Sequence, residues 1–136
     1  MKRISSLLLT LALMLTLLPT TVRAAVIDSG TCGENVTWSL DDAGMLTIAG
    51  TGAMTDYNID NFSDAPWYRV RDQIVNVVVQ SGVTSVGSYA FNGYSRIATI
   101  TLPDSVTTIG ERAFCWCNAL TGVTLSANVL SIGELV

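Results

Sequence analysis

The stretch that decides the fold is residues 97–117, which read IATITLPDSVTTIGERAFCWC. When the chain is moved by 23 residues, this stretch falls on residues 74–94 and 120–136, with apolar positions on apolar positions. Three aligned sets are Ile74, Ile97 and Leu120; Val77, Ile100 and Val123; and Val86, Ile109 and Ile132. A repeat of about 20–50 residues indicates units that bury their apolar faces only against their neighbours. The sequence therefore predicts a short repeat array.

Each unit contains two short extended segments separated by turns. In residues 97–102 the apolar side chains alternate as on the buried side of a strand. Residues 103–105 contain Pro, Asp and Ser and predict a turn, and residues 106–109 are β-branched and predict a second strand. Gly110 permits a backbone bend. Residues 111–114 have room for one or two helical turns, so we expect an α/β repeat.

The N-terminus has the features of a secretory signal peptide over residues 1–24. Lys2 and Arg3 form a basic start, residues 7–18 are an apolar run, and residues 22–24 (Val-Arg-Ala) suit signal peptidase. Twelve residues are too few for a transmembrane helix, which needs about 20. A buried core helix is the alternative interpretation of this run. We expect cleavage after Ala24, secretion, and no membrane span in the mature chain.

Residues 25–73 do not follow the 23-residue period and predict an N-terminal cap. Residues 36–40 alternate apolar and polar, residues 41–44 form a turn, and residues 45–48 return, which is typical of a β-hairpin. Residues 66–73 open with Pro, which suits the first position of a short helix. The end of a repeat array needs such a cap. Its core is expected to contain Trp38, Met54, Trp67 and Ile74.

The composition excludes several classes of function. The mature chain would contain no Lys and no His, and its four Arg against eleven acidic residues give a net charge of −7. Nucleic acids and anionic membranes bind clustered Lys and Arg, so neither is expected as a partner. Without His, Ser–His and Cys–His nucleophile pairs are impossible. We expect no catalytic residues, no cofactor and no metal, and therefore no enzyme.

Two acidic features have ordinary explanations. Four side chains are spaced like ligands of a twelve-residue calcium loop: Asp56, Asn58, Asp60 and Asp64. The twelfth position is Trp67, where such a loop needs Glu, so a solvated acidic loop is expected. Asp41 and Asp42 are adjacent in the hairpin turn and are expected to face water as turn formers.

The number of cysteines is odd: Cys32, Cys115 and Cys117. A bridge within Cys-Trp-Cys would be strained, and pairing with Cys32 stays open. Reduced thiols are expected, with Cys117 as a small buried hydrophobe.

The BspA-type leucine-rich repeat of bacterial surface proteins is the pattern that these units resemble: Ile97-x-x-Ile100-x-Leu102-Pro103-x-Ser105-Val106-Thr107-x-Ile109-Gly110-x-x-Ala113-Phe114-x-x-Cys117. The preceding unit has Tyr94 at the position of Cys117, a variation that the family pattern admits. Residues 33–38, 50–54 and 65–68 are similar to the segment that precedes such repeats in secreted proteins. The resemblance implies a leucine-rich-repeat solenoid of about two and a half repeats, 74–96, 97–119 and an incomplete 120–136, behind the hairpin cap.

The resemblance also implies a secreted or cell-surface protein that adheres to host matrix or cell-surface proteins. The expected binding surface consists of the strand residues that alternate with the core: Asn76, Val78, Thr99, Thr101, Gly122 and Thr124. Trp116 replaces Gly93 of the preceding unit and is a further candidate contact, because Trp is frequent at binding hot spots. Packing of Trp116 against a following repeat is the alternative.

The third unit stops at Val136, before the turn and the Phe of the other two. We expect a fragment of a longer surface protein, with a complete small protein as the alternative. An uncapped C-terminal repeat would expose apolar surface and could self-associate. The alternatives to binding are a role as leader and structural cap of a longer repeat protein, with or without a downstream enzyme domain.

Overall fold

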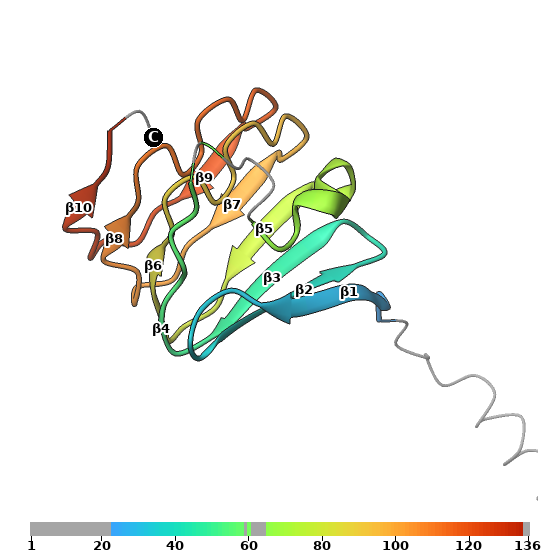
Figure 1. Ribbon diagram of the computed structural model, residues 1–136, viewed down its shortest axis with the longest axis horizontal. Coiled ribbons are helices and arrows are strands. Elements are labelled where there is room, and N and C mark those ends of the chain that lie inside the picture. The colour runs from blue at the N-terminus through green and yellow to red at the C-terminus, as the bar shows by residue number, and fades with distance from the viewer. Residues whose placement is uncertain (1–22, 59, 61–64, 135–136) are drawn as a thin grey trace, which may run out of the picture.

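The computed structural model describes residues 23–58, 60 and 65–134, so most of the predicted signal peptide and residues 135–136 lie outside the described chain. Two sheets lie side by side (Figure 1). The larger has the order β1 (Val26–Thr31), β2 (Val36–Asp41), β3 (Met45–Gly50), β5 (Asn76–Val79), β7 (Thr99–Thr101) and β9 (Gly122–Thr124). The smaller has the order β10 (Ser131–Ile132), β8 (Thr108–Ile109), β6 (Val83–Val86) and β4 (Gly52–Ala53).

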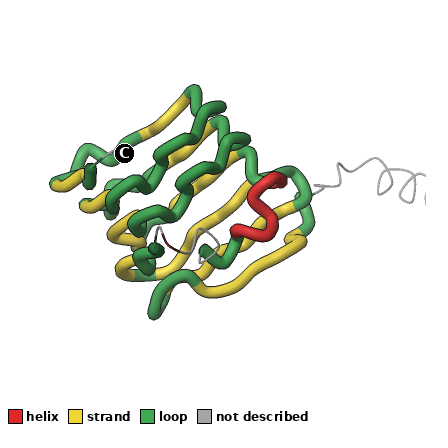
Figure 2. Tube along the Cα trace, turned by 45° about the horizontal axis from the view of Figure 1, so that its top comes forward, coloured by secondary structure: helices red, strands yellow, loops and turns green. Residues whose placement is uncertain are grey.

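The 23-residue spacing of the sequence is also the spacing between neighbouring strands. In the larger sheet, β5, β7 and β9 are parallel and place Val77 beside Ile100 and Ile100 beside Val123. In the smaller sheet, β6, β8 and β10 are parallel, and Ile109 lies between its counterparts from the neighbouring units. The backbone therefore coils from one sheet to the other and back (Figure 2).

The three N-terminal strands extend the same sheet. β2 and β3 pair antiparallel, with Trp38 opposite Ile48, where the sequence predicts the hairpin. β3 then runs parallel to β5, with Leu46 beside Val77, so the hairpin is continuous with the repeat strands. β1 pairs antiparallel with β2 and is an element that the sequence analysis does not predict.

The expected α contribution to the fold is wrong. Within residues 23–58, 60 and 65–134 there is no α-helix, and the short helix expected at Pro66 is the 3-10 helix η2 (Tyr68–Gln73). Residues 111–116 form turns in which Arg112 has φ 50° and Trp116 has φ 62°. A left-handed residue interrupts a right-handed helix, so no helical turn forms there. None of the described helices is long and apolar enough to cross a bilayer.

Hydrogen bonds between successive coils replace those of a helix. The N–H of Tyr89 donates to the carbonyl of Glu111 at 2.9 Å, and the N–H of Phe91 donates to Ala113 at 2.9 Å. Gly93 N–H donates to the carbonyl of Cys115 at 2.8 Å. Buried backbone groups must find partners, and here the neighbouring coil supplies them.

The core contains a column of aromatic rings. Phe91 is stacked against Trp67 at 5.3 Å and against Phe114 at 5.8 Å, with interplanar angles of 14° and 12°. Trp38 meets Trp67 edge to face at 6.0 Å, and the Trp67 indole N–H donates to the Ala90 carbonyl at 3.1 Å. The four residues expected in the cap core, Trp38, Met54, Trp67 and Ile74, are all buried.

Candidate binding surface

One row of side chains crosses all six strands of the larger sheet. The register aligns Ser29, Ser39, Thr47, Val78, Thr101 and Thr124. Residues directly opposite in a ladder share a face, and the residues on either side of Thr47 are buried, so this row points away from the core. Five of the six carry a hydroxyl group. With strands about 4.8 Å apart, the row is about 24 Å long. We call it the hydroxyl row.

A second row lies beside it on the same face. It consists of Met45, Asn76, Thr99 and Gly122. The Thr99 hydroxyl donates to Asn76 Oδ1 at 2.6 Å, which fixes the orientation of the amide. Thr99, Thr101 and Thr124 are exposed and Asn76 is partly buried. The structure therefore brings together the six strand residues that the sequence predicts for binding, in two rows that carry no charged side chain.

Half of the hydroxyl row is not predicted from the sequence. Ser29 comes from β1, which is not predicted, and Ser39 and Thr47 come from β2 and β3, which the sequence predicts only as a cap. The alternation of apolar and polar residues over 36–40 places Ser39 on the side opposite to the buried one. The sequence therefore indicates that Ser39 faces outward. The sequence does not indicate which strand lies next to β3. The neighbour is β5, and the two strands are separated by 26 residues or more.

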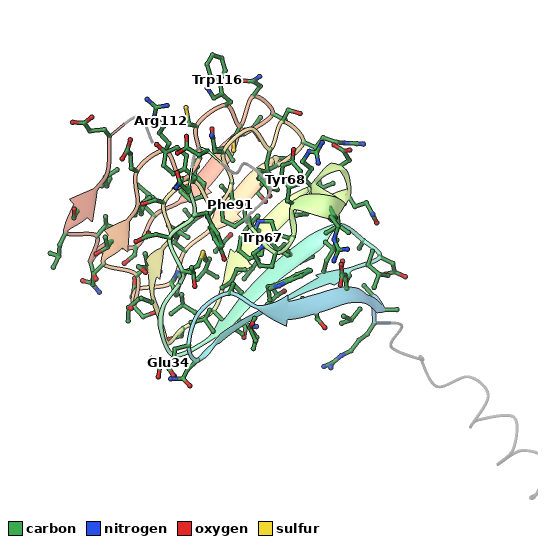
Figure 3. All side chains as sticks on the ribbon, viewed as in Figure 1. Glu34, Trp67, Tyr68, Phe91, Arg112 and Trp116 are labelled. Atoms are coloured by element: carbon green, nitrogen blue, oxygen red, sulfur yellow. The ribbon has the colours of Figure 1, made fainter. Side chains whose placement is uncertain are left out.

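Trp116 lies apart from this face. It belongs to the turns before β9 and points away from the body of the molecule (Figure 3). Its side chain is 71% exposed, and its backbone has φ 62°. Gly93, one unit earlier, has φ 81°, a conformation that glycine adopts without strain. Trp116 therefore combines an exposed indole with a left-handed backbone conformation that strains a residue other than glycine.

Replacing Trp116 with Gly is expected to stabilise the fold by about 1 kcal/mol. Gly removes the left-handed strain, and the exposed indole contributes little packing. Denaturant unfolding monitored by circular dichroism measures the change. Gly93→Ala is the matched control, because a Cβ there meets no atom within 4 Å yet acquires the same strain, and it should destabilise by a similar amount. A less stable Trp116→Gly chain would show that the indole packs.

Two of the three cysteine thiols are wholly or partly buried and have raised pKa values. Burial raises the pKa of the Cys32 thiol to about 12 and that of Cys117 to about 11, so both remain protonated at neutral pH. Cys117 Sγ lies 3.2 Å from the carbonyl oxygen of Phe91, to which the thiol donates, and all three thiols are free. Among the described residues, His, Cys, Asp and Glu form no group of three that could hold a metal.

Two of the side chains that have the spacing of calcium ligands instead accept hydrogen bonds from backbone N–H groups. Asp56 Oδ1 accepts the N–H of Ser88 at 2.8 Å, and Asn58 Oδ1 accepts the N–H of Asp60 at 3.2 Å. Asp64 lies outside the described residues.

The C-terminal end of the stacked coils exposes apolar side chains. A cavity of about 260 Å³ opens there, lined by Ile109, Phe114, Leu120, Val123, Leu125 and Ile132. Leu130, on the same coil, is 86% exposed. The positions equivalent to Leu120, Val123, Leu125 and Ile132 in the two preceding units are buried. This end thus has the shape and apolarity of the surface on which one coil packs against the next.

Comparisons with known proteins identify the repeat. Residues 66–136 match the family described as BspA type leucine rich repeat region (6 copies). A leucine-rich repeat protein from Eubacterium ventriosum is 37% identical, with a TM-score of 0.70 over 77% of this chain and 28% of that one. A leucine rich cell surface protein from Faecalibacterium prausnitzii is 17% identical, with a TM-score of 0.49 over 83% of this chain and 33% of that one. None of the curated proteins compared with the chain matches it. The chain spans 28% and 33% of these two structures and belongs to the BspA-type leucine-rich-repeat family.

Proposed function

We propose that this chain is a secreted, non-catalytic module that binds an extracellular protein, such as a host matrix or cell-surface protein, through the outer face of the larger sheet. Residues 25–73 cap a solenoid whose repeats are 74–96, 97–119 and 120–136. The observation that carries the proposal is the hydroxyl row, a continuous row of uncharged side chains about 24 Å long.

The chemistry of this face suits a protein partner. Hydroxyl groups donate and accept hydrogen bonds, and the side chains are short, so little rotamer entropy is lost on contact. Specific interfaces are depleted in charge at their centre, as these two rows are. The four Arg and eleven acids of the mature part lie outside the two rows. Trp116 is exposed but lies apart from this face, and it is a separate candidate contact.

Replacing Thr101 with Lys is expected to weaken partner binding by about 30-fold or more. Thr101 lies within the hydroxyl row, and an ammonium group there loses its water without gaining a partner, which costs about 2 kcal/mol or more. Surface plasmon resonance against a panel of immobilised extracellular-matrix and cell-surface proteins measures the dissociation constants. Wild-type affinity should change little with salt, because the two rows that form the proposed contact are uncharged.

The matched control is Thr108→Lys, which places the same charge on an exposed threonine of β8 in the smaller sheet. It should bind as the wild type does. If Thr101→Lys and Thr108→Lys bind equally well, the outer face of the larger sheet is not the binding surface. If wild-type chain binds no protein of the panel, the proposed partner class is wrong.

A second role, as the leading segment and structural cap of a longer array, is favoured by the apolar C-terminal end. The cavity beside Phe114 and the exposure of Leu125 and Ile132 leave a surface that a further coil would cover, or that a second copy could occupy by self-association. In this case neither Thr101→Lys nor Trp116→Gly alters binding by the full-length protein, because the contacts lie on later repeats.

A further inference from the structure

The turn between β2 and β3 is hydrogen-bonded to Ala25, the residue just before β1. The backbone N–H of Ala25 donates to Asp42 Oδ1 at 3.1 Å, and the Ala25 carbonyl accepts the N–H of Asp42 at 2.9 Å. Both residues are exposed at the edge of the larger sheet, and β1 starts at the next residue, Val26. The ordered pairing of the sheet thus begins at Ala25, the residue after the predicted signal-peptide cleavage site.

The two adjacent carboxylates of this turn accept hydrogen bonds from different parts of the chain. Asp41 Oδ1 accepts the N–H groups of Ala43 and Met45, at 3.0 and 2.9 Å, and so closes the turn. Asp42 instead directs its carboxylate to Ala25, 17 positions earlier in the chain. The expectation that both are simple turn formers therefore holds for Asp41 and misses the long-range contact of Asp42.

We propose that hydrolysis of the Ala24–Ala25 peptide bond is the maturation step of this chain, and that Asp42 binds the ammonium group that it creates. Water adds across the bond, so that Ala24 leaves with a carboxylate and Ala25 keeps the nitrogen as an ammonium group. The hydrogen bond at 3.1 Å then becomes an ion pair without movement of the heavy atoms. The proposal rests on the export of the chain proposed above.

The position of the bond supports this choice. A cut after Ala24 places Val22 and Ala24 at the two positions that signal peptidase reads, and it preserves every strand residue. A cut one residue later would place Arg23 at the outer of these positions and would remove Ala25, the partner of Asp42. The structure and the cleavage pattern therefore favour the same bond.

The charge around the turn favours an ammonium group as well. Asp41 and Asp42 are neighbours, and Asp28 lies nearby on β1, opposite Leu40. Within the described residues, the ion pair that the structure contains is between Arg112 and Glu111, far along the chain from this turn. The mature part has a net charge of −7, so a cation at Ala25 relieves repulsion where two carboxylates meet.

The experiment uses the full chain exported by a bacterial host, followed by intact mass measurement and N-terminal sequencing. The expected N-terminus is Ala25. The mature chain contains no Lys, so the ammonium group of Ala25 is its only amine, and an amine-reactive ester labels that group alone. Asp42→Asn is expected to accelerate labelling of the folded chain at neutral pH by roughly two- to fivefold, the size of an exposed ion pair. In denaturant the two chains should react at equal rates.

Glu34→Gln is the matched control. It removes one exposed carboxylate from the far end of β1 (Figure 3), and its labelling rate should equal that of the wild type. An N-terminus other than Ala25 would overturn the assigned cleavage site. Equal rates for Asp42→Asn and wild type would overturn the ion pair. Neither result depends on whether Thr101→Lys alters partner binding. Each proposal can therefore be contradicted without contradicting the other.

Discussion

The Phe91→Ala chain is expected to lose about 3–5 kcal/mol of unfolding free energy, a large part of the stability of a domain of this size. Phe91 is fully buried between the rings of Trp67 and Phe114, at 5.3 and 5.8 Å, and meets Tyr94 edge to face at 5.9 Å. Removing the ring leaves a cavity between successive coils and ends three aromatic contacts. In a repeat array the contacts between neighbours hold the structure together, so the loss affects both coils.

Urea unfolding followed by tryptophan fluorescence measures this change, because Trp67 reports on the column directly. Phe91→Leu is the control: it keeps most of the apolar volume and should cost less than half as much. Phe114→Ala should also cost less, since Phe114 lies beside the open cavity at the C-terminal end. If Phe91→Ala and Phe114→Ala are equally destabilising, the column does not have its centre at Phe91.

The positions of the strands can be predicted from the sequence because each unit repeats one pattern of apolar residues. Val77, Ile100 and Val123 align at a spacing of 23 residues, and the structure pairs them as direct neighbours. Stacking identical positions is the arrangement in which every unit covers the apolar face of the one before. The hairpin of residues 36–48 is predictable for a local reason, since its turn and its alternation lie within one short segment.

The turns could not be predicted in the same way. Residues 111–114 suggest helical turns by length and composition, but Arg112 adopts φ 50°. The cause is the neighbouring coil, which offers carbonyl and N–H partners in place of those within a helix, as between Phe91 and Ala113. Such contacts depend on the distance between coils, and no local propensity encodes it. β1 is not predicted because residues 26–31 include Asp28 and Gly30, which are uncommon in strands, although Gly33 and Asn35 suit the turn to β2.

The candidate surface was predictable only in part. Alternation identifies Asn76, Thr99, Thr101 and Thr124 as outward residues, and the structure gathers them on one face. The extension of that face across β1–β3 depends on the parallel pairing of β3 with β5, a contact between distant segments. Trp116 does not join the face, because its left-handed turn directs the indole away from the sheet.

The Gly110→Ala chain is expected to lose about 3 kcal/mol, the upper range for an overpacked site. A Cβ on Gly110 would lie 2.7 Å from the Cα of Ser88 and closer still to its backbone N. These are backbone atoms of the preceding coil, so they cannot rotate away as a side chain would. The Gly110 N–H donates to Val86 at 2.8 Å, and the Glu111 N–H donates to Ser88 Oγ at 3.2 Å. Widening the gap weakens both bonds.

The thermal unfolding of Gly110→Ala is compared with that of Gly122→Ala. The comparison separates the steric clash at Gly110 from the general effect of replacing glycine. A Cβ on Gly122 meets only the Thr99 methyl group at 3.8 Å, an ordinary contact, so Gly122→Ala should leave stability unchanged or raise it by about 0.5–1 kcal/mol. The sequence suggests a bend at Gly110, but the structure shows a close approach of two coils. The Gly at every 23rd position, 87, 110 and 133, is therefore explained by the distance between coils: each lacks the atom that would push its neighbour away. Equal stability of Gly110→Ala and wild type would contradict this explanation.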